Sequence, residues 1–137
     1  MTEGKHQSGD TGALKDLRTI ELGHLIAGPF CGQLMADHGA EVIKVEAPGS
    51  GDPMREWGRG KPVWWPVIAR NKKSITLNLR VSEGQGILKD LVRESDFLLE
   101  NFRPGTMEKW GLGWEELHEV NPRLIMIRVS GFGQTGP

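Results

Sequence analysis

The sequence predicts an α/β fold in which helices flank a parallel sheet. Short strands rich in β-branched residues alternate with helical stretches, and glycine or proline marks the transitions between them. Such alternation forms right-handed crossovers that leave the strands side by side and parallel. The last predicted strand is apolar at nearly every position, which is typical of a sheet that is covered on both faces.

In the N-terminal half, residues 17–22 (LRTIEL) alternate in polarity and predict the first strand. Pro29 favours the first turn of a helix over residues 29–38, and Gly39 is placed to follow its last turn. Residues 41–46 (EVIKVE) predict the second strand. Residues 47–66 are dense in glycine, proline and tryptophan without a sustained period, so we interpret them as a surface loop.

In the C-terminal half, residues 74–79 (SITLNL) predict the third strand. Ser82 with Gln85 three positions later resembles a capping box and predicts a helix over residues 84–95. A short strand is predicted at 97–100, a short helix at 114–120 and the last strand at 124–130. Because that last strand is apolar on both faces, we expect it to need partners on both.

Composition excludes several classes of protein. Charged residues make up 26% of the 137 residues and the net charge is −1, so no basic surface for nucleic acid or anionic membrane is indicated. The single cysteine, Cys31, cannot form an internal disulfide, which suits a reducing compartment. Residues 1–13 are polar and read as a loose tail, whereas residues 14–137 are long enough for one domain. We therefore expect a cytoplasmic domain without a membrane or nucleic-acid partner.

A glycine-rich motif near the end is a weak signal. Residues 131–136 (GFGQTG) match G-x-G-x-x-G, but they follow the last predicted strand instead of the first, and Pro137 comes next. We therefore do not predict a nicotinamide or flavin site. The four histidines lack metal-ligand spacing, so no metal is predicted. Cys31 has no evident activating base and is expected to pack as a small apolar residue.

Three features allow two interpretations each. The basic residues around 70–73 and 103–109 either bind phosphate or belong to solvated loops, and composition alone favours the loops. His24 follows the first strand, where α/β folds bind ligands, but a histidine bonded to nearby backbone is equally compatible. Four tryptophans either line a pocket or anchor loops: Trp57, Trp64, Trp65 and Trp110.

A series of short blocks in register resembles the class III (CaiB/BaiF) CoA-transferases. The resemblance runs from Leu14 to Pro137. Its blocks are LIAGPFC at 25–31, DHGAEVIKVE at 37–46, PGSGD at 48–52, RNKKSI at 70–75, ENFRPG at 100–105, GLG at 111–113, NPRLI at 121–125 and SGFGQTGP at 130–137.

The resemblance implies a Rossmann-like domain that is the N-terminal part of a larger fold, in a homodimer of interlocked ring-like subunits. It implies acyl-CoA and carboxylic acid substrates, with coenzyme A as the carrier and no metal. Two positions depart from the family, because Ala47 replaces a frequent arginine and Ala69 an asparagine. By similarity, the CoA-contacting positions are His24, Ile26, Ala27, Ala47, Ala69, Arg70, Asn71, Lys72, Asn101, Phe102, Arg103 and Lys109.

The family uses an aspartate as nucleophile, and the resemblance places that residue beyond Pro137. None of Asp37, Asp52, Asp90 and Asp96 lies at the matching place, so no catalytic residue is assigned, and this segment alone is expected to be inactive. An α-methylacyl-CoA racemase of the same fold is an alternative, with a His/Asp pair also beyond Pro137. A non-catalytic CoA-binding module is a second alternative.

Overall fold

The structure is a computed structural model that describes residues 12–58, 61 and 63–135. The predicted tail over residues 1–13 therefore lies almost entirely outside the described residues. Five strands form one sheet in the order β3-β2-β1-β4-β5, and each neighbouring pair is parallel. The strands are β1 (Arg18–Glu21), β2 (Glu41–Glu46), β3 (Lys72–Thr76), β4 (Phe97–Glu100) and β5 (Ile125–Arg128). The predicted parallel α/β fold is confirmed.

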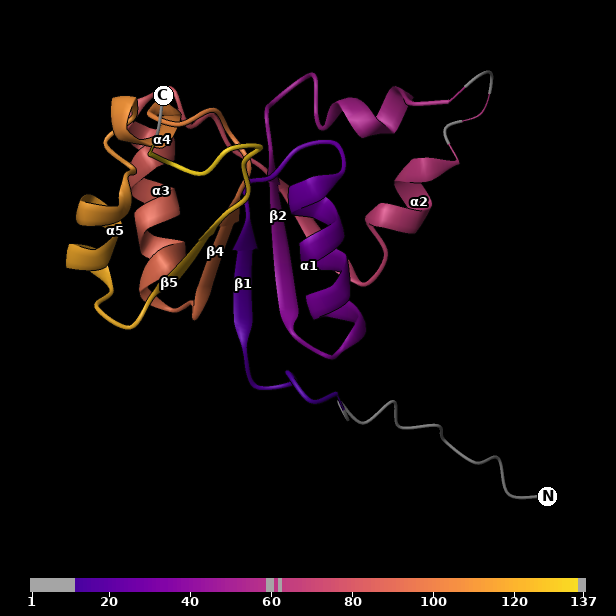
Figure 1. Cartoon of the computed structure of the whole chain (residues 1–137), viewed down its shortest axis with the longest axis horizontal. Helices are drawn as coiled ribbons and strands as arrows, with labels where there is room; N and C mark the ends of the chain where they lie inside the picture. The colour runs from indigo at the N-terminus through magenta and orange to yellow at the C-terminus, as the bar shows by residue number, and fades with distance from the viewer. Residues whose placement is uncertain (1–11, 59–60, 62, 136–137) are drawn as a thin grey trace.

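Helices cover both faces of this sheet. Figure 1 shows α1 (Ala27–Asp37) on one side of the strands, with α3 (Ser82–Arg93) and α5 (Trp114–Val120) on the other. Shorter helical segments connect these elements: η1 (Pro53–Glu56), α2 (Trp64–Ile68) and α4 (Thr106–Lys109). Gly39 follows α1 with a φ of 98°, as its predicted place after the last turn requires.

Three local predictions are wrong. The segment predicted as a loop over 47–66 contains η1 and the start of α2. The third strand begins and ends earlier than predicted, because its register with β2 runs from the Val42–Lys72 pair to the Glu46–Thr76 pair. The predicted capping box does not form: the Ser82 hydroxyl bonds Glu83, and the Gln85 amide donates to a loop carbonyl.

The two faces of the sheet differ in chemistry. Toward α3 and α5, β1 presents Ile20 to a large core that includes Leu88 and Leu117. Toward α1, Thr19 and Val42 lie in the amino halves of β1 and β2, and the charged side chains of Glu21 and Lys44 are buried farther along these strands. A Cβ at Gly32 of α1 would lie 1.9 Å from Glu21 Oε2, so the glycine makes room for that carboxylate. The sequence analysis did not predict this buried charged layer.

The strand order indicates where a ligand site is expected in this fold. Order along the sheet reverses at β1, because the chain extends first through β2 and β3 and then returns to β4 on the opposite side of β1. The loops that follow β1 and β4 consequently lead to opposite faces and leave a crevice at the carboxyl edge of the strands. A ligand site is therefore expected beside the residues that follow these two strands.

Candidate functional site

A cavity of about 490 Å³ opens at the carboxyl edge of the sheet. Its walls come from the segments that follow four different strands, as expected at a point where strand order reverses. The lining residues are Leu22, His24, Val45, Glu46, Ala47, Pro48, Ser50, Leu77, Asn78, Leu79, Arg80, Phe102, Thr106 and Trp110. We call this space the switch-point cavity.

The backbone of His24 is held by the side chain of Asn101. The His24 N–H donates to Asn101 Oδ1 at 2.7 Å, and Asn101 Nδ2 donates to the His24 carbonyl at 2.9 Å. The close approach depends on glycine, because a Cβ at Gly28 would lie 3.0 Å from Gly23 Cα and 3.1 Å from Asn101 Oδ1. This arrangement fixes the loop after β1 relative to the loop after β4.

Three aromatic rings form one wall of the switch-point cavity. His24 and Phe102 meet edge to face with centroids 5.2 Å apart, and Phe102 and Trp110 do so at 5.3 Å. Burial lowers the pKa of His24, although the nearby Asp52 carboxylate opposes that change. The imidazole is therefore held toward its neutral form, which suits contact with an apolar or hydrogen-bonding part of a ligand.

One cationic side chain lines the switch-point cavity, and two others are close in sequence to residues that line it. Arg80 lines the cavity from the segment after β3, and Arg103 and Lys109 follow β4. All three are exposed, and within the described residues none takes part in an ion pair. An exposed guanidinium such as that of Arg80, beside an apolar cavity, is suited to binding the phosphates of a ligand.

The structure gives Arg70, Asn71 and Lys72 other partners. Arg70 donates to both oxygens of Asp37, and the Asn71 amide donates to the same carboxylate. Lys72 Nζ lies 2.7 Å from Glu21 Oε2 and donates to the Pro29 carbonyl, with its side chain only 1% exposed. Burial lowers the pKa of Lys72, and Glu21 opposes the change.

These residues begin β3, whereas the switch-point cavity lies at the other end of that strand. Ala69, Arg70, Asn71 and Lys72 are therefore not brought together with His24, Ala47 and Phe102, which do line the cavity. In their place, the cavity contains residues 77–80, which the sequence analysis missed. The available signal was the position of Arg80, directly after the strand predicted over residues 74–79. Residues 77–79 gave no signal, because that prediction places them inside the strand.

Glu46 ends β2, at the place where dinucleotide-binding folds carry a ribose-binding acid. Here both of its oxygens are already engaged. Arg55 donates to the two oxygens at 2.7 Å each, Ser74 Oγ to Oε1 at 2.5 Å and the Asp52 N–H to Oε2 at 2.8 Å. Burial works to raise the pKa of Glu46, but these hydrogen bonds outweigh it and lower the pKa to about 2. The residue thus serves the fold, and the turn after β1 also lacks the G-x-G-x-x-G pattern.

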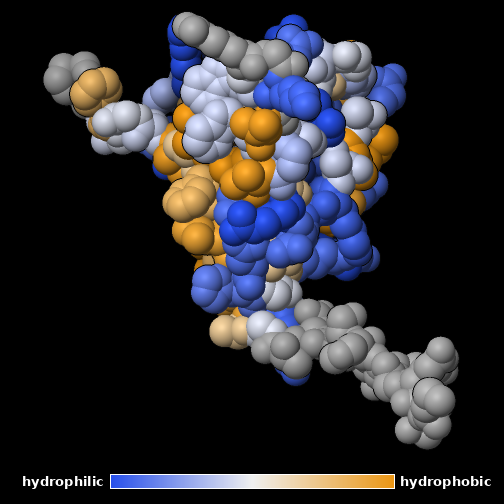
Figure 2. Space-filling view, turned by 90° about the vertical axis from the view of Figure 1, so that its right-hand side faces the viewer, coloured by the Kyte–Doolittle hydropathy of each residue, from blue (hydrophilic) through white to orange (hydrophobic). Residues whose placement is uncertain are grey.

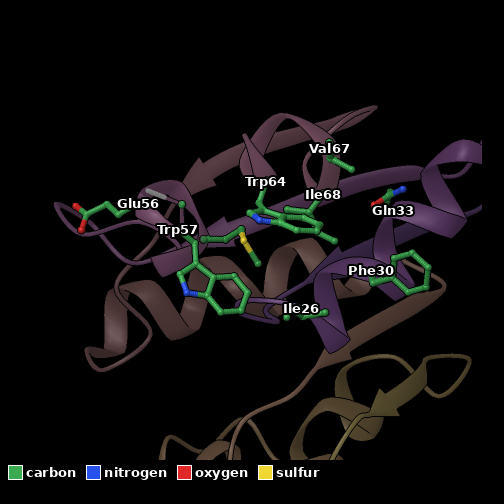
Figure 3. Close-up of a pocket in the computed structure, with 10 residues that line it drawn as sticks. Ile26, Phe30, Gln33, Glu56, Trp57, Trp64, Val67 and Ile68 are labelled. Carbon is green, nitrogen blue, oxygen red and sulfur yellow. The ribbon is translucent and has the colours of Figure 1, made fainter. Parts of the chain in front are cut away.

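A second cavity, of about 750 Å³, lies between α1, η1 and α2. Figure 3 shows Trp57, Trp64 and Ile26 directed toward it, while the Glu56 carboxylate points away. On the surface that carries α1 and α2, hydrophobic residues lie beside a hydrophilic region (Figure 2). We call this space the apolar cavity; its lining is Ile26, Phe30, Gln33, Met54, Glu56, Trp57, Gly58, Trp64, Val67 and Ile68.

The tryptophans therefore divide between the two interpretations. Trp57 and Trp64 line the apolar cavity and Trp110 lines the switch-point cavity. Trp65 instead packs against the Arg55 guanidinium, 3.9 Å from the ring centroid.

In the ranges 12–58 and 63–135, no helix is long and apolar enough to cross a bilayer, and no group of three or more His, Cys, Asp or Glu side chains is placed to hold a metal. Burial raises the pKa of Cys31, helped by Glu21, so its sulfur is held as a thiol.

The fold and the switch-point cavity define an open, doubly covered α/β domain with a ligand cavity at its strand-order reversal. The model of CoA-transferase family III matches residues 14–137, nearly the whole chain. The chain therefore belongs to CoA-transferase family III.

Curated relatives and solved structures agree with this assignment. The chain is 71% identical over 128 residues to succinyl-CoA–D-citramalate CoA-transferase of Chloroflexus aurantiacus, covering 90% of this chain and 32% of the relative. It is 52% identical to the beta subunit of succinyl-CoA–L-malate CoA-transferase of the same organism, with the same coverage. A CaiB/BaiF family protein from Brucella suis superposes with a TM-score of 0.87 at 40% identity, over 92% of this chain and 35% of that one. The chain thus spans about a third of the length of these proteins.

Proposed function

We propose that this chain is the N-terminal part of a CoA-transferase and that coenzyme A binds in the switch-point cavity. The observation that carries the proposal is the convergence of four strand ends on one cavity, which has an aromatic wall and the exposed Arg80 in its lining, in a member of CoA-transferase family III. Coenzyme A joins an anionic nucleotide to a long, mostly apolar arm, and these two kinds of lining match its two parts.

Individual residues have distinct proposed roles. Arg80, Arg103 and Lys109 bind phosphate oxygens, and His24 and Phe102 contact the arm, with Asn101 holding His24 in place. Ala47 leaves space in the cavity where a larger side chain would project. Arg70 and Lys72 are less suited to bind coenzyme A directly, because Arg70 is paired with Asp37 and Lys72 with Glu21.

For the reaction, we propose the transfer of CoA from succinyl-CoA to a dicarboxylic acid of the citramalate or malate type. The support is the 71% and 52% identity to enzymes named for these substrates. An aspartate outside this segment attacks the thioester carbonyl, and a mixed anhydride forms as CoA thiolate leaves. The thiolate then attacks the aspartyl carbonyl of the anhydride and releases succinate, and the acceptor carboxylate takes up CoA through the reverse steps. We place this chemistry in a cytoplasmic, interlocked homodimer.

The test uses the full-length protein that contains this segment. Succinyl-CoA is incubated with D-citramalate or L-malate, and the new acyl-CoA is measured by chromatography. Formation of citramalyl-CoA or malyl-CoA with release of succinate is the expected result. Exchange of the α-proton of a 2-methylacyl-CoA in deuterated water, without transfer, would indicate a racemase instead. CoA binding without either reaction would indicate a non-catalytic module, and absence of CoA binding would contradict the proposal altogether.

A further inference from the structure

The loop after β1 separates the two cavities. His24 lines the switch-point cavity, and Ile26 lines the apolar cavity. Between them, Leu25 has a φ of 61°, a left-handed conformation that a leucine adopts only where its surroundings impose it. We call residues 23–26 the partition loop. The partition loop thus contributes to the lining of both cavities.

Asp52 stabilises the left-handed conformation of Leu25 through a hydrogen bond. Its side chain is buried, and Oδ1 accepts hydrogen bonds from the Leu25 N–H at 3.1 Å and the Met54 N–H at 2.8 Å. Met54 lines the apolar cavity, so one carboxylate oxygen ties the partition loop to the wall of that cavity. The other oxygen, Oδ2, lies 2.8 Å from Lys44 Nζ.

Lys44 completes the attachment of the loop. Its Nζ donates to the Gly23 carbonyl at 2.7 Å and to Glu21 Oε1 at 3.0 Å. Glu21 in turn pairs with Lys72 on its other oxygen. The four side chains are buried and their formal charges balance, with two ammonium and two carboxylate groups. Removing one member of this array would be strongly destabilising, because it leaves another charge unpaired in the interior.

We propose that Asp52 is a positioning residue. It holds the partition loop in the conformation in which the switch-point cavity and the apolar cavity have the shapes that substrate binding requires. The inference rests on the proposed function, and it assigns to Asp52 a role in binding without contact with CoA. Asn101 fixes His24 from the β4 side; Asp52 fixes Leu25 from the opposite side.

The first variant is Asp52→Asn in the full-length enzyme. Three donors surround the Asp52 carboxylate, but an amide of the same size offers a single acceptor oxygen, so its NH₂ group must face either Lys44 or the two backbone N–H groups. We expect the KM for succinyl-CoA to rise about tenfold or more, as for a lost charged hydrogen bond. The matched control is Asp96→Asn, because Asp96 also accepts a backbone N–H but lies at the amino edge of the sheet. That control is expected to leave the KM unchanged.

Two double variants separate positioning from stability. Lys44→Met with Asp52→Asn removes one charge of each sign and leaves an amide oxygen free to accept the Leu25 N–H. Lys44→Met with Asp52→Leu has the same charge but no acceptor. The inference predicts that the first double variant has the lower KM, by about three- to tenfold, the range of one neutral hydrogen bond.

Equal KM values in the two double variants would overturn the inference, as would an Asp52→Asn enzyme with the KM of the wild type. The proposed function is tested separately by the wild-type enzyme. If the wild type bound no CoA, the function and the inference would both fall, whereas wild-type activity with unaffected variants removes only the inference.

Discussion

The amide of Asn101 bonds both polar groups of the His24 peptide backbone, with its oxygen 2.7 Å from the His24 nitrogen and its nitrogen 2.9 Å from the His24 oxygen. The two residues are 77 positions apart in sequence and follow adjacent strands. One side chain therefore joins the two loops that diverge at the reversal of strand order, and it does so beside the proposed CoA site.

Asn101→Asp should weaken this connection without a change in size. The carboxylate still accepts the His24 N–H, but its second oxygen then faces the His24 carbonyl, and two acceptors repel. We expect a loss of about 1–3 kcal/mol in the free energy of unfolding and a KM for succinyl-CoA that is roughly tenfold higher. Denaturant titration and steady-state kinetics measure the two effects.

The matched control is Asn121→Asp. The Asn121 amide also bonds backbone groups in both directions, because it donates to the carbonyls of Val92 and Ser95 and accepts the Arg123 N–H, but it precedes β5 at the amino edge of the sheet. It should lose stability and keep its KM. A comparable KM change in both variants would mean that the Asn101 effect is a general loss of stability.

Neutralising Arg80 should weaken CoA binding, whereas neutralising Lys72 should lower the stability of the fold. Arg80→Ala removes an exposed cation at the cavity, so we expect CoA affinity to fall about tenfold at low salt, with little change in stability. Lys72→Met leaves part of the buried Glu21 carboxylate unpaired, which is expected to cost about 3–5 kcal/mol in the free energy of unfolding. Calorimetric titration with CoA and thermal unfolding of both variants provide the comparison. A stable Lys72→Met protein with weak CoA binding would instead support Lys72 as a phosphate ligand.

Glu46 should make the free energy of unfolding depend on pH in the acidic range. Its pKa in the fold is about 2, against an ordinary value of 4.5, so its contribution is fully present above pH 4.5 and is lost as the pH falls toward 2. A difference of this size corresponds to stabilisation on the order of 3 kcal/mol. Glu46→Gln should therefore be less stable than the wild type near neutral pH, with a gap that narrows on acidification. A gap that is independent of pH over this range would contradict the assignment.

Gly32→Ala should destabilise the protein, although alanine is the better helix former. A Cβ at this position would lie 1.9 Å from Glu21 Oε2, and displacing that carboxylate disturbs the buried charges. We expect a loss of about 1–3 kcal/mol. Gly86→Ala in α3 is the control, because a Cβ there meets no atom within 4 Å and should stabilise by about 0.5–1 kcal/mol. Equal effects at both positions in equilibrium unfolding would show that contact with Glu21 is unimportant.

The sequence predicted where the five strands lie along the chain, because alternation and punctuation report local structure, and strand–helix alternation predicted their parallel direction. Residues 41–46 and 97–100 match β2 and β4 in full. The site was harder to predict. Lys72 and Arg80 are both basic and lie near one strand, and only pairing with β2 reveals that the first begins β3 and the second follows its end. Similarly, Asp52 reads as part of a glycine-rich loop, and its bonds to Leu25 and Lys44 join segments distant in sequence.

The most direct test of the CoA site is the crystal structure of the full-length protein with bound coenzyme A. Our account predicts that CoA occupies the switch-point cavity, with its arm against His24 and Phe102 and its phosphates within hydrogen-bonding distance of Arg80, Arg103 or Lys109. Lys72 should remain paired with Glu21 in that complex. Coenzyme A bound at the amino edge of the sheet, against Arg70 and Lys72 with the switch-point cavity unoccupied, would contradict the account.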